Sequence, residues 1–404
     1  MKKAFFLCAS SLFLSSCASL RLPVSALRPG GENELRAAIA AGGDVNAVYQ
    51  GGISPLMEAS YRNLPEIVSI LIDAGAHIEA RDKDGFTALI YAAAGASFMP
   101  AEMLIQKGAN REAKEYLTAK TALFFAAENN SPRLVKLLFG GEEAVFDGGV
   151  TALMHASALG ASDAVSELIK NGADLRRRDD SGRDALFHAV RNDMLKTSEL
   201  LIRSGASVKA EYDSGLLHLA AARNNIDMVR LIVDAGADMS VKDKHDFSPF
   251  GEAVRAGSFE AASFFLAGGA SANERQDDLT PMMIAAKNND LKMAVLLAEN
   301  MADVNSVSSD GTTAIFHAAM RNYTAMAEFL IGMLADVNAA DSKGWTPLMT
   351  AVAENSLDTA RLLIKNGADV NARNGEALNA LEIAKHKRND KMVSALKAAG
   401  AREY

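Results

Sequence analysis

The sequence contains very few of the residues on which cysteine chemistry depends. Among its 404 residues there are only two cysteines, Cys8 and Cys17, and both lie within the first seventeen positions. The remainder of the chain therefore cannot form a disulfide, supply a thiolate nucleophile or hold a metal through cysteine.

Long apolar runs and aromatic residues are also scarce. Hydrophobic residues make up 49% of the chain, but no run approaches the roughly eighteen residues that a membrane-spanning helix needs. Aromatic residues reach only 6%, and Ala, Gly and Leu carry the apolar pattern, which suits short helices in thin, closely packed layers. The net charge of −8 argues against nucleic acid as a partner, because such binding favours a basic surface.

The first residues have the pattern of an export signal. Lys2 and Lys3 precede an apolar stretch, Ala4 to Leu14, that is too short to span a bilayer. This stretch ends in Leu14-Ser15-Ser16-Cys17, which resembles the lipobox of bacterial lipoproteins. The resemblance implies that residues 1–16 are removed as a signal peptide and that Cys17 receives a diacylglycerol and an acyl chain such as palmitate.

Two readings of the leader stay open. In the alternative, an ordinary signal peptide is cleaved near Ala18 and Cys17 has no role. The lipobox resemblance instead predicts a membrane anchor, and by the enterobacterial sorting rule Ala18 favours the outer membrane over the inner one. Residues 17–31 contain Pro23, Pro29 and two glycines without an apolar period, so we expect a lipidated tether there.

The rest of the chain is a repeat. A short phrase, in which a helix-capping residue is followed by an apolar and Ala-rich segment, recurs every 30–34 residues, and an eleventh, degraded copy starts at Asn379. The marking residues of the ten clear copies are Ser54, Thr87, Thr121, Thr151, Asp184, Gly215, Ser248, Thr280, Thr313 and Thr346. Such regularity predicts one small unit stacked many times.

Each unit reads as a turn, two helices and an extended arm. In the copy from Asp341 to Arg373, Thr346 and Pro347 predict a helix start, and Asn366-Gly367 predicts the end of a second helix. Phrases such as Leu217-His218-Leu219-Ala220-Ala221 and Gly367-Ala368-Asp369-Val370-Asn371 resemble the ankyrin repeat. The resemblance implies an all-α solenoid with a β-hairpin-like arm in each unit, forming a curved, elongated array of about twelve repeats over residues 32–401.

Some copies depart from that pattern. Met301 and Leu334 stand where the family has a helix-ending glycine, so their side chains are expected in a strained, left-handed backbone. One repeat ends in Gly140-Gly141-Glu142-Glu143 and the next spacing is short, which predicts an irregularity near residues 139–150.

No catalytic or metal-binding pattern is present. The sequence has no nucleotide-binding loop, nucleophile elbow or paired-histidine zinc motif, and its seven histidines fall in separate repeats. His218 occupies the family's structural histidine position, and His155 and His188 lack a third ligand. We therefore expect no enzyme activity, no cofactor, no metal and no small-molecule substrate.

One basic residue near the end of the first helix recurs in five consecutive repeats: Arg191, Arg223, Arg255, Lys287 and Arg321. His188 and His317 are expected on the same face, because positions three and four apart on a helix are neighbours. In ankyrin arrays that face lines the concave groove, so the row predicts a site for an acidic segment of a partner protein. The alternative is that these cations are simply solvated and favourable near helix C-termini.

These observations predict a lipid-anchored protein of a bacterial cell envelope that binds another protein and has no catalysis of its own. On the periplasmic side, which we favour, it is expected to be an adaptor, protector or inhibitor of its partner. The alternative is a surface-exposed lipoprotein that contacts host proteins.

Overall fold

The computed structural model describes residues 21–141, 145–209 and 215–403, and the leader with Cys17 lies outside these ranges. The chain is an all-α solenoid of paired helices and divides into two compact units, one ending at Ser207 and the other beginning at Val208. Within the described ranges no helix is both long enough and apolar enough to cross a membrane.

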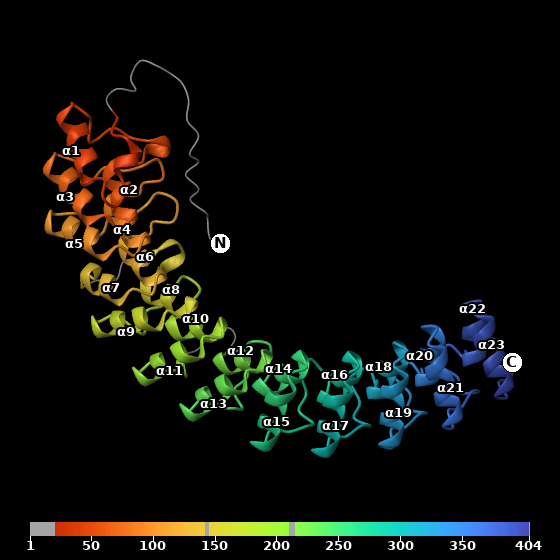
Figure 1. Ribbon diagram of the computed structural model, residues 1–404. Coiled ribbons are helices and arrows are strands. Elements are labelled where there is room, and N and C mark those ends of the chain that lie inside the picture. The colour runs from red at the N-terminus through yellow and green to blue at the C-terminus, as the bar shows by residue number, and fades with distance from the viewer. Residues whose placement is uncertain (1–20, 142–144, 210–214, 404) are drawn as a thin grey trace. The chain divides into compact units, whose positions relative to one another are not determined.

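In the first unit, paired helices form two layers, which Figure 1 shows in red to green. The layer of first helices contains α2 (Pro55–Tyr61), α4 (Ala88–Ala94), α6 (Ala122–Glu128), α8 (Ala152–Leu159) and α10 (Ala185–Arg191). The layer of second helices contains α1 (Glu32–Ala40), α3 (Pro65–Asp73), α5 (Phe98–Gln106), α7 (Pro132–Leu138), α9 (Ser162–Lys170) and α11 (Leu195–Arg203).

The second unit repeats this arrangement, in green to blue in Figure 1. Its first helices are α12 (Leu216–Ala222), α14 (Pro249–Ala256), α16 (Pro281–Asn288), α18 (Ala314–Met320), α20 (Pro347–Ala353) and α22 (Ala380–His386). Its second helices are α13 (Ile226–Asp234), α15 (Phe259–Ala267), α17 (Leu291–Glu299), α19 (Thr324–Gly332), α21 (Leu357–Lys365) and α23 (Asp390–Ala398).

The marking residues start the first helices as the sequence predicted. The Thr346 hydroxyl accepts a hydrogen bond from the Met349 N–H at 3.3 Å, and Pro347 occupies the first helical position. Leu348 and Val352 of the same helix are fully buried between neighbouring repeats. Because each repeat covers the apolar face of the next, the core is a continuous stripe along each unit.

Tight hairpins connect the repeats. At the start of one hairpin, the Asp341 carboxylate accepts hydrogen bonds from the N–H groups of Lys343 and Trp345. Gly344 has φ +74°, and an added Cβ would lie 3.1 Å from the Gly375 nitrogen, so this tip requires glycine. The Gly375 N–H donates to the Lys343 carbonyl at 2.7 Å, which links this hairpin to the next one.

A ladder of asparagines, one in the extended arm of each of several repeats, links these arms to the following repeats. Asn338 Nδ2 donates to the Gly367 carbonyl of the next repeat at 3.1 Å, while its Oδ1 accepts from the Asp369 N–H at 2.7 Å. Asn46 makes the same pair of bonds in the first unit, as do Asn273, Asn305 and Asn371 in the second. Each asparagine therefore satisfies two backbone groups at the end of the following helix pair.

The predicted irregularities are present. Helix α7 ends at Leu138, and beyond it the short strands β1 (Val145–Phe146) and β2 (Val150–Thr151) pair antiparallel around the 3₁₀ turn η3 (Asp147–Gly149). Met301 and Leu334 have φ values of 65° and 66°, so both adopt the left-handed backbone that the sequence predicted. Each side chain is 84% exposed.

At the N-terminal end the described structure differs from a free tether. Leu22, Ala26 and Leu27 are buried, and the 3₁₀ turn η1 (Val24–Ala26) packs against α1. The Tyr49 hydroxyl, just before the 3₁₀ turn η2 (Gln50–Gly52), donates to the Leu22 carbonyl at 3.0 Å. Residues from Arg21 onward therefore form part of the first layer of the array. The prolines and glycines around this short apolar cluster made it difficult to recognise in the sequence.

Candidate protein-binding surface

The predicted row of cations lies at the carboxyl ends of first helices. Arg191 is the last residue of α10 in the first unit. In the second unit, Arg223 and Arg321 follow α12 and α18 directly, while Arg255 and Lys287 lie in the last turns of α14 and α16. All five side chains are exposed, and a positive charge at this place is favourable because the last helical carbonyls carry partial negative charge.

Arg255 differs from its neighbours because it is paired inside its own helix. Its Nε donates to Glu252 Oε2 at 2.8 Å, and a second hydrogen bond joins its Nη2 to Oε1. These hydrogen bonds raise the pKa of the Arg255 guanidinium and compensate much of its charge. Within the described ranges no carboxylate forms an ion pair with Arg223, Lys287 or Arg321, so the available positive charge of the second unit's row lies on these three.

His317 lies among these cations on α18. Its ring is partly buried, and Nε2 has no hydrogen-bond partner in the described part of the chain. Burial, followed by the charge of Lys287, lowers the pKa of His317; Arg321 acts in the same direction and Asp310 opposes it. Lys287 and Arg321 therefore lie close enough to His317 for their charges to act on its ring.

His188, in the first unit, differs from His317 because its ring has a hydrogen-bond partner. Its Nε2 lies 2.9 Å from Asp179 Oδ2, and its side chain is only 14% exposed. Burial of Asp179 is outweighed by hydrogen bonds from the Arg183 N–H and the His188 ring, so the pKa of this carboxyl is lowered. His188 therefore links α10 to the hairpin that contains Asp179. An equivalent link occurs in an earlier repeat, where the Tyr91 hydroxyl of α4 donates to Asp82 Oδ2 at 2.8 Å.

His218 forms the structural link that the family resemblance implied. Its Nε2 lies 2.8 Å from the Phe247 carbonyl in the next repeat, and the side chain is buried. Its Nδ1 has no partner in the described structure. Gly215 is the N-cap residue of α12 and has no side chain that could bond to Nδ1. A Cβ at this position would lie 2.7 Å from Nδ1, so Gly215 is the residue directly beside the unsatisfied nitrogen.

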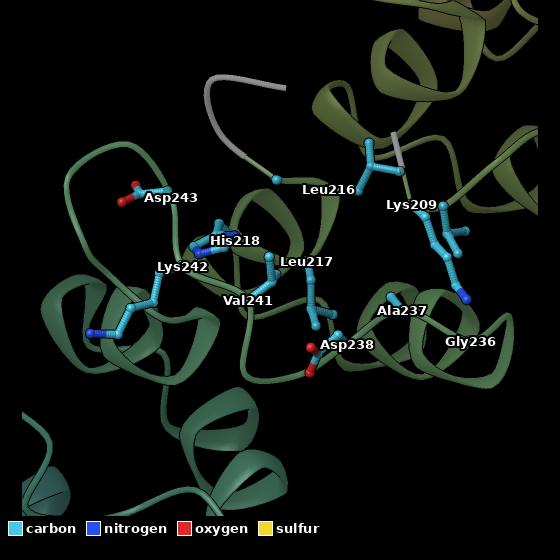
Figure 2. A pocket seen from close by; sticks show the side chains of 12 residues that line it. Lys209, Leu216, Leu217, His218, Gly236, Ala237, Asp238, Val241, Lys242 and Asp243 are labelled. Atoms are coloured by element: carbon cyan, nitrogen blue, oxygen red, sulfur yellow. The ribbon is translucent and has the colours of Figure 1, made fainter. Parts of the chain in front are cut away.

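A cleft of about 420 Å³ opens beside His218. Figure 2 shows its lining, which comes from the start of α12, the loop after α13 and the following hairpin, with Lys209, Lys242 and Asp238 at its margin. The described residues contain no group of three or more histidine or acidic side chains that could hold a metal ion.

Comparison with known families gives an extended match. The sequence model described as "Ankyrin repeats (3 copies)" matches residues 25–115, 123–212, 217–308 and 295–374. The matched ranges together contain most of the described helices in both units.

Curated relatives match over part of their length. The chain is 31% identical over 206 residues to the mouse B-cell lymphoma 3 protein homolog, covering 48% of this chain and 38% of that protein. It is 31% identical over 225 residues to human B-cell lymphoma 3 protein, covering 51% and 42%. The Arabidopsis thaliana E3 ubiquitin-protein ligase KEG is 24% identical over 309 residues, covering 62% and 19%. The chain thus spans less than half the length of each of these proteins.

Two solved structures are similar over about half of this chain. An ankyrin repeat domain from Acinetobacter baumannii AYE is 26% identical with a TM-score of 0.44, covering 46% of this chain and 98% of that one. The human ASB11 ankyrin repeat domain is 23% identical with a TM-score of 0.46, covering 50% and 91%.

Proposed function

This chain belongs to the ankyrin-repeat family, and on that premise we propose that it is a lipid-anchored protein of a bacterial cell envelope that binds an acidic segment of a partner protein. Ankyrin repeats generally bind other proteins, and the fold is typically a non-catalytic interaction scaffold. The proposed role is that of an adaptor, protector or inhibitor of the partner, without catalysis of its own.

One observation carries the proposed binding site. Arg223, Lys287 and Arg321 are exposed at the ends of first helices and have no ion pair among the described residues, although the whole chain carries a net charge of −8. An acidic partner segment would supply the missing counter-charges. Arginine pairs with carboxylates through two parallel hydrogen bonds, so the two arginines would fix the register of the segment as well as attract it.

The proposed location depends on the leader. Leu14-Ser15-Ser16-Cys17 supports lipidation of Cys17, and Ala18 supports the outer membrane, with the array on the periplasmic side. Two or three acyl chains anchor a protein stably, because each buried methylene contributes about 0.8 kcal/mol.

Replacing the anchoring cysteine tests the location. The full-length chain and a Cys17→Ser variant would be produced in a Gram-negative host, labelled with an alkyne analogue of palmitate and fractionated. We expect the label and the outer-membrane location only in the parent chain. An unlabelled parent chain, or a variant that stays equally in the membrane, contradicts lipid anchoring.

Photo-crosslinking tests the binding site. A photoreactive amino acid at the exposed position Asn288, beside Lys287, should capture a discrete protein in cells. The triple variant R223E/K287E/R321E should lose that product while fractionating normally. The matched control R361E/K365E/K343E makes the same change in net charge at other exposed positions and should keep it. Equal capture by both variants contradicts the site.

Surface display is the second candidate, and protease treatment of intact cells distinguishes it. A periplasmic array is protected until the outer membrane is opened, whereas a displayed array that contacts host proteins is cut at once.

A further inference from the structure

A second positively charged surface lies on the layer of second helices in the first unit. The second helices α5 and α7 are neighbours in their layer, and a groove of about 570 Å³ runs beside them. Its lining consists of Phe98, Arg111, Arg133, Lys136 and Leu137.

The groove combines an apolar floor with cationic walls. Phe98 and Leu137 are partly buried, while the three cations are exposed. The guanidinium of Arg133 stacks on the Phe98 ring, 4.0 Å from its centroid. This stacking holds the arginine in place at the groove and leaves its edge N–H groups available for a carboxylate.

The cations of the groove have no acidic partner among the described residues. Some other exposed cations on the same layer have one, since Lys107 pairs with Asp73 and Arg203 pairs with Glu199, although Arg36 and Lys196 have no ion pair in the described part of the chain. Glu112 is next to Arg111 in the sequence, but it forms no ion pair with any of the three groove cations. The groove therefore brings three unpaired cations together, in a protein whose overall charge is −8.

We propose that this groove binds a peptide segment in which one aromatic or large aliphatic side chain is flanked by carboxylates. The apolar side chain would rest on Leu137 and on the outer face of the Arg133 guanidinium, which covers the Phe98 ring, and the carboxylates would pair with Arg111, Lys136 and the edge of Arg133. The three cations beside a partly buried apolar floor match a segment that carries both carboxylates and an apolar side chain, and the vesicle experiment below distinguishes it from a lipid surface. The site is separate from the row on the second unit's first helices and adds a second docking point to the array.

A defined peptide tests the proposal directly. The probe is fluorescein-labelled Glu-Glu-Phe-Glu-Glu, and its binding to the chain lacking the leader is followed by fluorescence anisotropy at low salt. A second peptide has glycine in place of phenylalanine and the same charge. We expect the phenylalanine peptide to bind about tenfold more tightly, since burial of one aromatic side chain is worth more than 1.4 kcal/mol. Equal binding of the two peptides would overturn the proposal.

Charge reversal locates the site. R133E/K136E changes two exposed residues of α7 and should weaken binding of the phenylalanine peptide by about tenfold or more. R361E/K365E makes the same change on the exposed side of α21 and should leave binding unchanged. Circular dichroism confirms that each variant folds. Loss with the triple variant R223E/K287E/R321E but not with R133E/K136E would assign the peptide to the row and overturn the groove.

Vesicles separate a lipid from a peptide. Vesicles of phosphatidylcholine with about 30% phosphatidylglycerol provide an anionic surface without a peptide. We expect R133E/K136E and R361E/K365E to weaken vesicle binding to the same extent, because each reverses two exposed cations. Vesicle binding that requires Arg133 and Lys136, without phenylalanine-dependent peptide binding, would overturn the proposal in favour of a lipid surface.

Discussion

At the scale of single residues, Met301 and Leu334 carry a conformational cost that little side-chain burial offsets. Both hold a left-handed backbone and are 84% exposed, so their side chains contribute little burial. The corresponding position in the next repeat is Gly367, with φ +88°. A side chain in this conformation costs about 1 kcal/mol relative to glycine, because its Cβ approaches the following carbonyl.

We therefore predict that Met301→Gly and Leu334→Gly each stabilise the chain by roughly 0.5–1 kcal/mol, seen as a higher urea midpoint. The reverse change, Gly367→Leu, provides the control. No atom lies within 4 Å of its added Cβ, so only the backbone conformation is tested, and stability should fall by a similar amount. Lower stability of both glycine variants would show that the exposed side chains contribute contacts to folding.

His317 gives a pH dependence whose sign follows from its surroundings. Its pKa in the folded chain is lowered, so between that value and the ordinary value near 6.5 the unfolded chain binds more protons. The stabilising contribution of neutral His317 is complete above that ordinary value and is lost as the pH falls through the window below it. The carboxyls whose pKa values are lowered, such as Asp179 and Asp310, lose their contribution only in more acidic solution, below about pH 4.

We predict that acidification from about pH 7.5 to 5.5 lowers the thermal unfolding midpoint more for the parent chain than for His317→Gln. The comparison variant is His245→Gln, which removes an exposed hairpin histidine. It should keep the parent's response to acid. An unchanged acid response in His317→Gln would exclude His317 as a contributor.

At the scale of elements, the strongest links join one repeat to the next. His218 connects α12 to the arm before α14 through the Phe247 carbonyl, at 2.8 Å. We predict that His218→Leu destabilises the chain by about 0.5–1.5 kcal/mol, because the change removes one buried hydrogen bond while the Phe247 carbonyl keeps its bond from the Asp243 N–H at 2.9 Å. The urea midpoint measures this loss, and His218→Gln, which keeps a donor, should recover part of it. No loss in the leucine variant would mean that the hydrogen bond from the Asp243 N–H is sufficient for the Phe247 carbonyl.

Helix starts and ends could be predicted from the sequence because each depends on adjacent residues. Thr346-Pro347 and Asn366-Gly367 mark their helices through local geometry alone. The short cluster at Leu22 was missed because prolines and glycines surround it and its burial depends on α1.

The candidate site was harder to predict because charge pairing depends on side-chain partners. The charge of Arg255 is compensated by Glu252, three residues earlier. The same spacing also occurs between charged residues that do not pair, so the sequence alone did not indicate this ion pair. The pairing of His188 with Asp179 spans a hairpin whose geometry sequence alone did not supply. The groove at Phe98 and Arg133 joins residues one repeat apart, so alignment of the repeats on one another could have suggested it.

At the scale of the whole molecule, stability should be transmitted between neighbouring repeats only. In a solenoid each repeat contacts the one before and the one after, so its stability is the sum of its own term and two interface terms. The last repeat illustrates this: α22 and α23 cover α20 and α21, and Asn371 bonds to the Gly400 carbonyl and the Arg402 N–H. Damage at this end should therefore remain local.

Deletion of residues 374–404 tests local transmission by amide hydrogen exchange. We predict that protection in α20 and α21 falls by about tenfold or more, because their apolar face becomes exposed, while α12 to α15 keep their protection. Glu403→Gln is the matched control. It removes only exposed ion pairs with Lys385 and Lys397, which contribute little, and should leave exchange almost unchanged. A uniform loss of protection across all helices from α12 onward would instead mean that this unit folds as one cooperative body.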